Sequence, residues 1–92
     1  TEMSNVEFIK RATAAVVDYF NHHVDVTDNF ALAAEDTFVV WVCKTLQNHK
    51  ALISTTVPDG MYYEITYNGD KDEMYLDVYQ KMHNEIIKIE EN

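Results

Sequence analysis

The stretch that decides the fold is a central apolar run, Phe38-Val39-Val40-Trp41-Val42-Cys43. It consists of β-branched and aromatic residues and a cysteine, a composition that favours an extended strand. Side chains alternate between the two faces of a strand, and here both alternating sets are apolar, so this strand needs cover on both sides. We therefore expect a sheet in which this run forms the first strand.

Two further strands are predicted after it. One covers residues 50–56 and is reached through a turn near Gln47-Asn48. The other covers residues 61–67, where an apolar set alternates with more polar residues and is expected to face the core: Met61, Tyr63, Ile65 and Tyr67. Between them stands Val57-Pro58-Asp59-Gly60, which has the chemistry of a tight turn, because proline presets φ, aspartate bonds to nearby backbone and glycine accepts a positive φ.

A helix is predicted upstream, over residues 4–22. Ser4 and Glu7 have the spacing of a capping box at its start. Behind them apolar residues recur at helical spacing and predict one buried stripe: Val6, Ile9, Ala12, Val16, Tyr19, Phe20 and Val24. Residues 24–36 show no clear period and are interpreted as an irregular connection, in which residues 30–34 form one helical turn or lie extended.

The stretch after Asn68-Gly69 fits two structures. It can be a hairpin turn into a fourth strand, because Met74, Leu76 and Val78 alternate. It can also begin a helix over residues 71–89, with Asp70 and Glu73 at capping-box spacing and an apolar stripe from Met74 to Ile89. We favour the helix. The predicted fold is thus a single α+β domain over residues 1–92, a three-stranded antiparallel meander with a helix at each end (α-β-β-β-α).

The charge of the chain limits its partners. Sixteen acidic and seven basic residues give a formal net charge of −9, which repels nucleic-acid phosphates and anionic membranes. We therefore expect no direct nucleic acid binding and no membrane association. Cys43 is the only cysteine, and neither a signal-peptide pattern nor an apolar run of membrane-spanning length is present. These features predict a cytoplasmic protein.

Motifs that carry chemistry are scarce. With Gly60 and Gly69 as the only glycines, a phosphate-binding loop is excluded, and neither a G-x-S-x-G elbow nor a C-x-x-C pair occurs. One cluster resembles metal ligands (His22, His23, Asp25 and Asp28), but adjacent histidines on a helix point about 100° apart. A composite site with His49 and His83 stays open. We predict no catalytic residue, no metal and no cofactor.

Tyrosines and acids gather in one stretch. Five of the six tyrosines lie between residues 62 and 79, together with much of the acidic excess. The pattern suits amphipathic residues at the edge of a core, or a surface that contacts a partner, since tyrosine offers a rigid ring and a hydroxyl. The candidate partner-binding residues are Tyr62, Glu64, Asp70, Asp72, Glu73 and Asp77.

The central half of the chain resembles a known family. The similarity is carried by four stretches: Val40-Trp41-Val42-Cys43-Lys44-Thr45-Leu46-Gln47-Asn48, Lys50-Ala51-Leu52-Ile53-Ser54-Thr55-Thr56, Asp59-Gly60-Met61-Tyr62-Tyr63-Glu64 and Thr66-Tyr67-Asn68-Gly69-Asp70-Lys71. They are similar to a family of small uncharacterised proteins encoded by phages and prophages of Gram-positive bacteria. The resemblance implies the cytoplasm of an infected or lysogenic bacterium as the setting, and it implies no mechanism.

Two functions follow as expectations. The first is a non-enzymatic interaction protein that binds a host or phage protein, for example to antagonise a host defence nuclease or another nucleic-acid-binding protein through an acidic surface. The alternative is an accessory protein that binds a small molecule or nucleotide; it would need a basic or glycine-rich pocket, for which Lys44, His49 and Lys50 are the only local candidates.

Self-association is also expected. The first strand of a meander lies at an edge, and an exposed apolar edge strand is normally covered. Helices on both faces, residues 30–34 or a second copy could each cover it. We favour a homodimer whose interface includes Val39 and Trp41, with the sheets paired across a two-fold axis.

Overall fold

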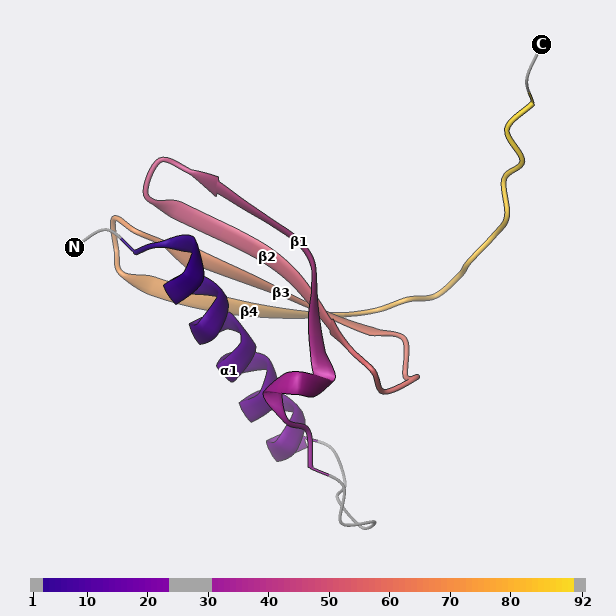
Figure 1. The fold of residues 1–92 in the computed structure, drawn as a ribbon, viewed down its shortest axis with the longest axis horizontal. Coiled ribbons are helices and arrows are strands. Elements are labelled where there is room, and N and C mark those ends of the chain that lie inside the picture. The colour runs from indigo at the N-terminus through magenta and orange to yellow at the C-terminus, as the bar shows by residue number, and fades with distance from the viewer. Residues whose placement is uncertain (1–2, 24–30, 91–92) are drawn as a thin grey trace.

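One helix and one sheet make up the fold (Figure 1). The computed structural model describes residues 3–23 and 31–90. In these ranges α1 (Asn5–His23) lies across one face of a four-stranded antiparallel sheet. The strands follow one another across the sheet in chain order: β1 (Thr37–Thr45), β2 (Asn48–Thr55), β3 (Met61–Asn68) and β4 (Glu73–Gln80). A short 3-10 turn, η1 (Ala34–Asp36), precedes β1.

The helix begins where its cap was predicted. The Ser4 hydroxyl oxygen accepts the Glu7 backbone N–H at 3.1 Å. The Glu7 carboxylate pairs with Arg11 at 3.0 Å, one turn further on, so the hydroxyl half of the predicted box forms. Within residues 3–23 and 31–90, no helix combines the length and the apolar character that crossing a membrane requires.

The core lies between α1 and the middle strands. α1 buries Phe8, Ala12, Val16 and Phe20, which recur every four residues and form one stripe. This stripe packs on the inward side chains of β2 and β3, including Ala51, Ile53, Tyr63, Ile65 and Tyr67. The inward set predicted for residues 61–67 is therefore confirmed. The predicted helix stripe was wrong at Val6, which is 67% exposed, and it lacked Phe8, which is fully buried.

The turn between β2 and β3 forms as predicted. Gly60 has a φ of 71°, and the Asp59 carboxylate accepts the Met61 backbone N–H at 3.0 Å. The turn between β1 and β2 carries Leu46 at a φ of 57°, a conformation that a leucine seldom adopts. The register of β1 against β2 shifts between Val39 and Trp41, which places a β-bulge at Val40.

The predicted C-terminal helix is wrong, and with it the α-β-β-β-α order. Residues 73–80 form β4 instead, paired with β3 from Asn68↔Glu73 to Met61↔Gln80. Met74, Leu76 and Val78 alternate inward and pack against the core. The Asn68 side chain accepts the backbone N–H groups of Asp70 and Lys71, so it closes a turn where the helix was expected to begin. Residues 81–90 continue from β4 without helix or strand.

The connection between α1 and β1 is described from residue 31 onward. The predicted irregular connection over residues 24–36 therefore lies partly outside the described residues. In the described part, the Asn21 side-chain amide pairs with the Leu32 backbone, accepting its N–H at 2.8 Å and donating to its C=O at 3.0 Å. Leu32 is buried. Residues 31–33 are thus held at the end of α1 rather than over β1.

Two hairpin turns touch at the far end of the sheet. The Gly69 N–H donates to the Asn48 side-chain oxygen at 2.9 Å, and the Gln47 amide donates to the Asp70 carboxylate. A Cβ on Gly69 would lie 2.3 Å from the Gln47 carbonyl oxygen. Only a residue without a side chain allows this approach.

Gly69→Ala should therefore lower the free energy of unfolding by about 2 kcal/mol, because the added methyl forces two backbone segments apart. Urea denaturation followed by circular dichroism measures this. Lys71→Ala, an exposed change in the same turn, serves as the control and should stay within about 0.5 kcal/mol of the original chain. Equal stabilities for the two variants would contradict the observed contact between the turns.

Candidate functional site

The side of the sheet opposite α1 has no described element over it (Figure 1). Side chains alternate along a strand, so the residues between the buried ones of β2 and β3 point to this side. Cross-strand pairing extends the set to β1 and β4. We call the resulting surface the open face; it comprises Trp41, Cys43, Lys50, Leu52, Tyr62, Glu64, Thr66, Tyr75, Asp77 and Tyr79.

Aromatic and aliphatic side chains form the centre of the open face. Trp41 pairs with Leu52 and Tyr62 with Tyr79 across neighbouring strands. They line a shallow depression of about 450 Å³, which reaches the start of the C-terminal segment at Lys81. Trp41 remains 42% exposed. The depression is thus an apolar surface that no described part of the chain covers.

Charge on the open face is predominantly negative. Glu64 and Asp77 are cross-strand partners and lie side by side. Lys50 is the basic member of the face and pairs with Glu64 at 3.5 Å. The Tyr79 hydroxyl donates to the same Glu64 oxygen at 3.4 Å. Acidic groups therefore adjoin the aromatic centre, an arrangement that suits a partner with both basic and apolar groups.

These carboxylates alter the acidity of nearby tyrosines. The negative charge of Glu64 is the main cause that raises the pKa of Tyr79, and burial and Asp77 add to it. The pKa of Tyr75 is raised chiefly by its hydrogen bond to Glu73. Tyrosine hydroxyls are protonated at neutral pH at their ordinary pKa, and the raised pKa values of Tyr75 and Tyr79 extend that state further into the alkaline range.

The residues predicted for partner binding separate into two groups. Tyr62, Glu64 and Asp77 lie together on the open face, and Glu73 stands at its end on β4. Asp70 and Asp72 lie in the β3–β4 turn instead, where Asp70 accepts the Gln47 amide and Asp72 accepts the Tyr67 hydroxyl. These two bonds give both aspartates a structural role.

The predicted self-association residues lie on opposite sides of β1. Trp41 pairs with Leu52 on the open face, whereas Val39 pairs with the inward residue Ile53. Sequence reasoning missed Leu52, Lys50 and Tyr79 as members of the surface. Their place depends on strand register; the alternation of Met74, Leu76 and Val78 was the available signal for Tyr79 on β4, whereas Lys50 and Leu52 lie on β2.

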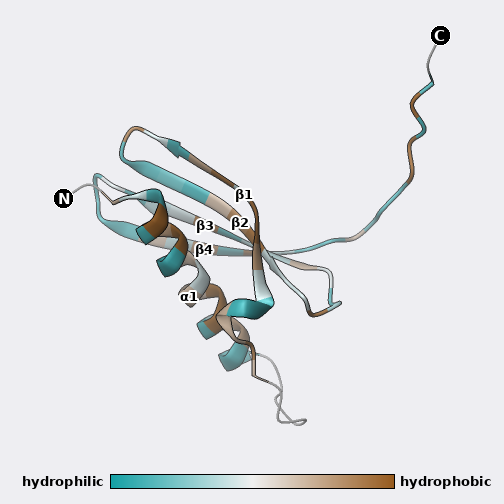
Figure 2. Ribbon diagram, viewed as in Figure 1, coloured by the Kyte–Doolittle hydropathy of each residue, from teal (hydrophilic) through white to brown (hydrophobic). Residues whose placement is uncertain are grey.

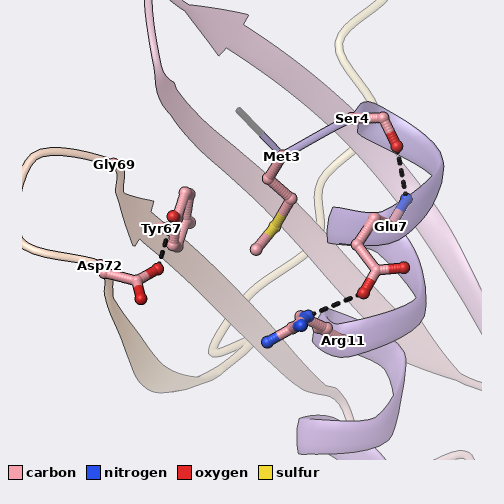
Figure 3. Close-up of a pocket in the computed structure, with 7 residues that line it drawn as sticks. All are labelled: Met3, Ser4, Glu7, Arg11, Tyr67, Gly69 and Asp72. Carbon is pink, nitrogen blue, oxygen red and sulfur yellow. Dashed lines mark hydrogen bonds and ion pairs between the residues drawn. The ribbon is translucent and has the colours of Figure 1, made fainter. Parts of the chain in front are cut away.

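A second hollow lies on the α1 side of the sheet (Figure 3). It has a volume of about 610 Å³ and is lined by Met3, Ser4, Glu7, Arg11, Tyr67, Gly69 and Asp72. Its polar groups bond to one another: Glu7 contacts Ser4 and Arg11, and Tyr67 donates to Asp72. Because Arg11 is already paired with Glu7 and Asp72 stands opposite, the hollow is poorly suited to an anion.

The three residues proposed for a nucleotide do not converge. His49 is buried between α1 and the sheet, where it stacks on Phe8 at 4.9 Å. Its ring nitrogens contact the Asn5 side chain and the Met3 carbonyl, each at 2.9 Å. Lys44 pairs with His49 on the inward side of the sheet, whereas Lys50 belongs to the open face. The sheet therefore separates Lys50 from Lys44 and His49.

The histidines proposed for a metal are engaged at the end of α1. The ring of His22 contacts the Asp18 carbonyl and that of His23 the Tyr19 carbonyl. Asp25 and Asp28 lie outside the described residues. Among residues 3–23 and 31–90, no group of three or more His, Cys, Asp or Glu side chains is placed to hold a metal ion.

His49→Ala should lower the free energy of unfolding by about 3 kcal/mol, because it opens a cavity beside Phe8 and leaves the Asn5 and Met3 groups unpaired. Chemical denaturation measures the loss. His83→Ala, at an exposed position of the C-terminal segment, is the matched control and should change stability by less than about 0.5 kcal/mol. If the His49 variant were as stable as the control, the assignment of His49 to the core would be contradicted.

Glu64→Gln should lower the pKa of Tyr79 toward its ordinary value, because the charge that chiefly raises it disappears. The ring ¹³Cζ chemical shift followed against pH reports this titration residue by residue. The pKa of Tyr67, raised mainly by its bond to Asp72, provides the internal control and should not move. An unchanged Tyr79 titration would mean that Glu64 and Tyr79 are not neighbours on the open face.

Comparison with known proteins places the chain in a family. No curated protein and no solved structure matches it significantly. A family of unknown function, DUF6275, matches residues 9–89, which include most of α1, all four strands described and nearly all of the C-terminal segment. The chain belongs to this family of unknown function.

Proposed function

We propose that the chain is a non-enzymatic interaction module that binds a protein partner through its open face. The main observation behind this proposal is an apolar centre that no described part of the chain covers; it is formed by Trp41, Leu52, Tyr62 and Tyr79. Contiguous exposed apolar surface of this kind commonly marks a binding site. Aromatic residues are enriched in protein interfaces, whereas small-molecule sites are typically enclosed clefts, and the depression here is shallow.

The charges of the surface favour a basic partner. Glu64 and Asp77 lie beside the aromatic centre, and the whole chain carries a net charge of −9. A partner with a basic and apolar strip would be attracted over a distance and then pack on the rings. The most specific form of this proposal is that the partner is a nuclease or another nucleic-acid-binding protein, and that the acidic open face occupies the groove in which this protein binds phosphates.

The setting of this proposal comes from sequence. The resemblance of the central stretches to small phage and prophage proteins of Gram-positive bacteria supports action in the cytoplasm of an infected or lysogenic cell. The partner is then a host or phage protein, and antagonism of a host defence protein is the corresponding role. The nucleotide-binding alternative lacks support, because Lys50 lies on the open face, away from Lys44 and the buried His49.

Affinity capture from a lysate of a Gram-positive host tests the proposal. Tyr62→Ser combined with Tyr79→Ser removes two rings from the open face without touching the core, and recovery of a partner captured by the original chain should fall at least about tenfold. Glu64→Lys with Asp77→Lys should reduce recovery as strongly, because it reverses the charge of the face.

The matched control is Asp18→Lys with Glu35→Lys. It changes the net charge by the same amount at exposed positions on α1 and η1, away from the open face. This control should capture the partner normally. Circular dichroism establishes that all variants are folded. Normal capture by both folded open-face variants would show that the open face is not the binding surface.

A further inference from the structure

β1 exposes apolar side chains on both of its sides. It stands at one edge of the sheet, with β2 as its hydrogen-bonded neighbour within the described residues. Figure 2 shows β1 as hydrophobic along most of its length. Exposure ranges from 37% to 48% over five consecutive residues, Phe38, Val39, Val40, Trp41 and Val42. Such an edge is a template for pairing with another extended segment.

The cover that β1 needs does not come from the described parts of its own chain. α1 packs over the middle of the sheet, and residues 31–33 are held at the end of α1 by Asn21. Val39 and Val42 lie on the α1 side and still expose 37% each, and Trp41 on the open face exposes 42%. The edge strand is therefore incompletely covered on both sides.

A second apolar segment lies uncovered in the same chain. Residues 81–90 leave β4 at a hydrogen bond from the Lys81 N–H to the Gly60 carbonyl, 2.7 Å long, and extend away from the sheet (Figure 1). Every residue in this segment is exposed. Its large apolar side chains expose between 76% and 87% of their surface: Met82, Ile86, Ile87 and Ile89.

The amount of exposed surface has the size of an interface. The chain exposes 6918 Å², about 1,400 Å² more than the roughly 5,500 Å² expected for a compact monomer of 10.7 kDa. Its radius of gyration is 15.6 Å, against about 12 Å for a compact domain of this length. A standard stable interface buries about 800 Å² on each partner, and exchanged or obligate ones bury more. The extended residues 81–90 contribute to this excess, and an interface that covers them in a second copy would reduce it.

We propose that the protein forms a two-fold homodimer in which residues 81–90 of each copy pack along β1 of the other. An extended segment can add to an exposed sheet edge through its backbone groups, while alternate side chains occupy both faces. In an extended segment Met82 and Ile86 would lie on one face and Ile87 and Ile89 on the other. β1 is likewise apolar on both of its faces. A single contact would thus cover both β1 and residues 81–90. A two-fold axis would form the same contact a second time and limit the assembly to two copies.

The sheet order favours exchange over folding back. β1 and β4 occupy opposite edges, roughly 14 Å apart for strands spaced about 4.8 Å. Residues 81–90 leave from the β4 edge and run away from the sheet, so they reach a neighbouring copy without reversing direction (Figure 1). This arrangement differs from direct β1–β1 pairing, because the added strand is the C-terminal segment.

Charge points to the same two segments. Two copies with a net charge of −9 repel each other, and contact is least costly where acids are absent or balanced. β1 contains no acidic residue, and residues 81–90 carry Lys81 and Lys88 against Glu85 and Glu90. Added salt screens the repulsion between the copies, so dimerisation should strengthen as ionic strength rises.

Light scattering coupled to size exclusion at low micromolar concentration is the first test. The original chain should elute at about twice 10.7 kDa. Ile86→Asp with Ile89→Asp should give a folded monomer, because it places charges within the apolar contact. The matched control is His83→Asp with Asn84→Asp, which adds two acids at polar positions of the same segment and should remain a dimer.

Disulfide cross-linking then identifies the contact. Cys43 of β1 is the only cysteine and is exposed. A chain that combines Cys43→Ser with Lys88→Cys, or with Asn84→Cys, is mixed with the original chain and oxidised. A mixed disulfide dimer that is absent for the Ile86→Asp, Ile89→Asp background supports exchange.

Three outcomes would overturn the proposal. They are a monomeric original chain, a dimer that survives Ile86→Asp with Ile89→Asp, and cross-linking through Cys43 of both copies with none to residues 84 or 88. Trp41 belongs to both proposed surfaces, but the two tests are distinct, because the capture variants Tyr62→Ser and Tyr79→Ser leave both β1 and residues 81–90 unchanged.

Discussion

The packing of α1 across the middle strands is the contact on which the rest of the structure depends. Phe8, Ala12 and Val16 are fully buried against Ala51, Ile53 and Ile65 of β2 and β3. A helix is about 10 Å wide with its side chains, whereas strands spaced about 4.8 Å apart place β1 and β4 roughly 14 Å from each other. A single helix therefore covers the centre of one face. The bare β1 edge follows from this mismatch in width, and the open face from the placement of α1 on the other side of the sheet.

Local sequence patterns were sufficient wherever neighbouring residues determine the structure. The Ser4 cap, the Asp59-Gly60 turn and the inward alternation of β3 all formed as expected. The C-terminal helix failed because Met74, Val78 and the residues after them fit a helical stripe as well as a strand. The strand is realised through its pairing with β3, and the turn before it also contacts Gln47 and Asn48, some twenty residues earlier. The pattern within residues 68–80 fits both structures, and contacts with residues outside this range are needed to choose between them.

The sequence predicted the kinds of residue in the candidate surface better than it predicted which residues belong to it. The concentration of tyrosines and acids after residue 61 indicated a contact surface, and Tyr62, Glu64 and Asp77 do lie together. Leu52 and Lys50 lie beside them because of the way β2 pairs with β3. Asp70 and Asp72 do not belong to the surface, because their carboxylates accept hydrogen bonds from Gln47 and Tyr67. Register decides which side of the sheet a residue occupies, and a shift of one residue would reverse it.

The acidic charge and the apolar edge are best understood together. An exposed strand such as β1 would pair indiscriminately in a neutral protein, and charge is one of the means by which proteins prevent this. Here the acids lie outside β1. Two copies therefore repel each other through their net charge at a distance, but no acidic side chain on β1 opposes a segment that pairs with this strand. Only an approach that buries enough apolar surface can outweigh that repulsion. The same charge that keeps copies apart thereby makes the edge selective for a partner that fits it along its length.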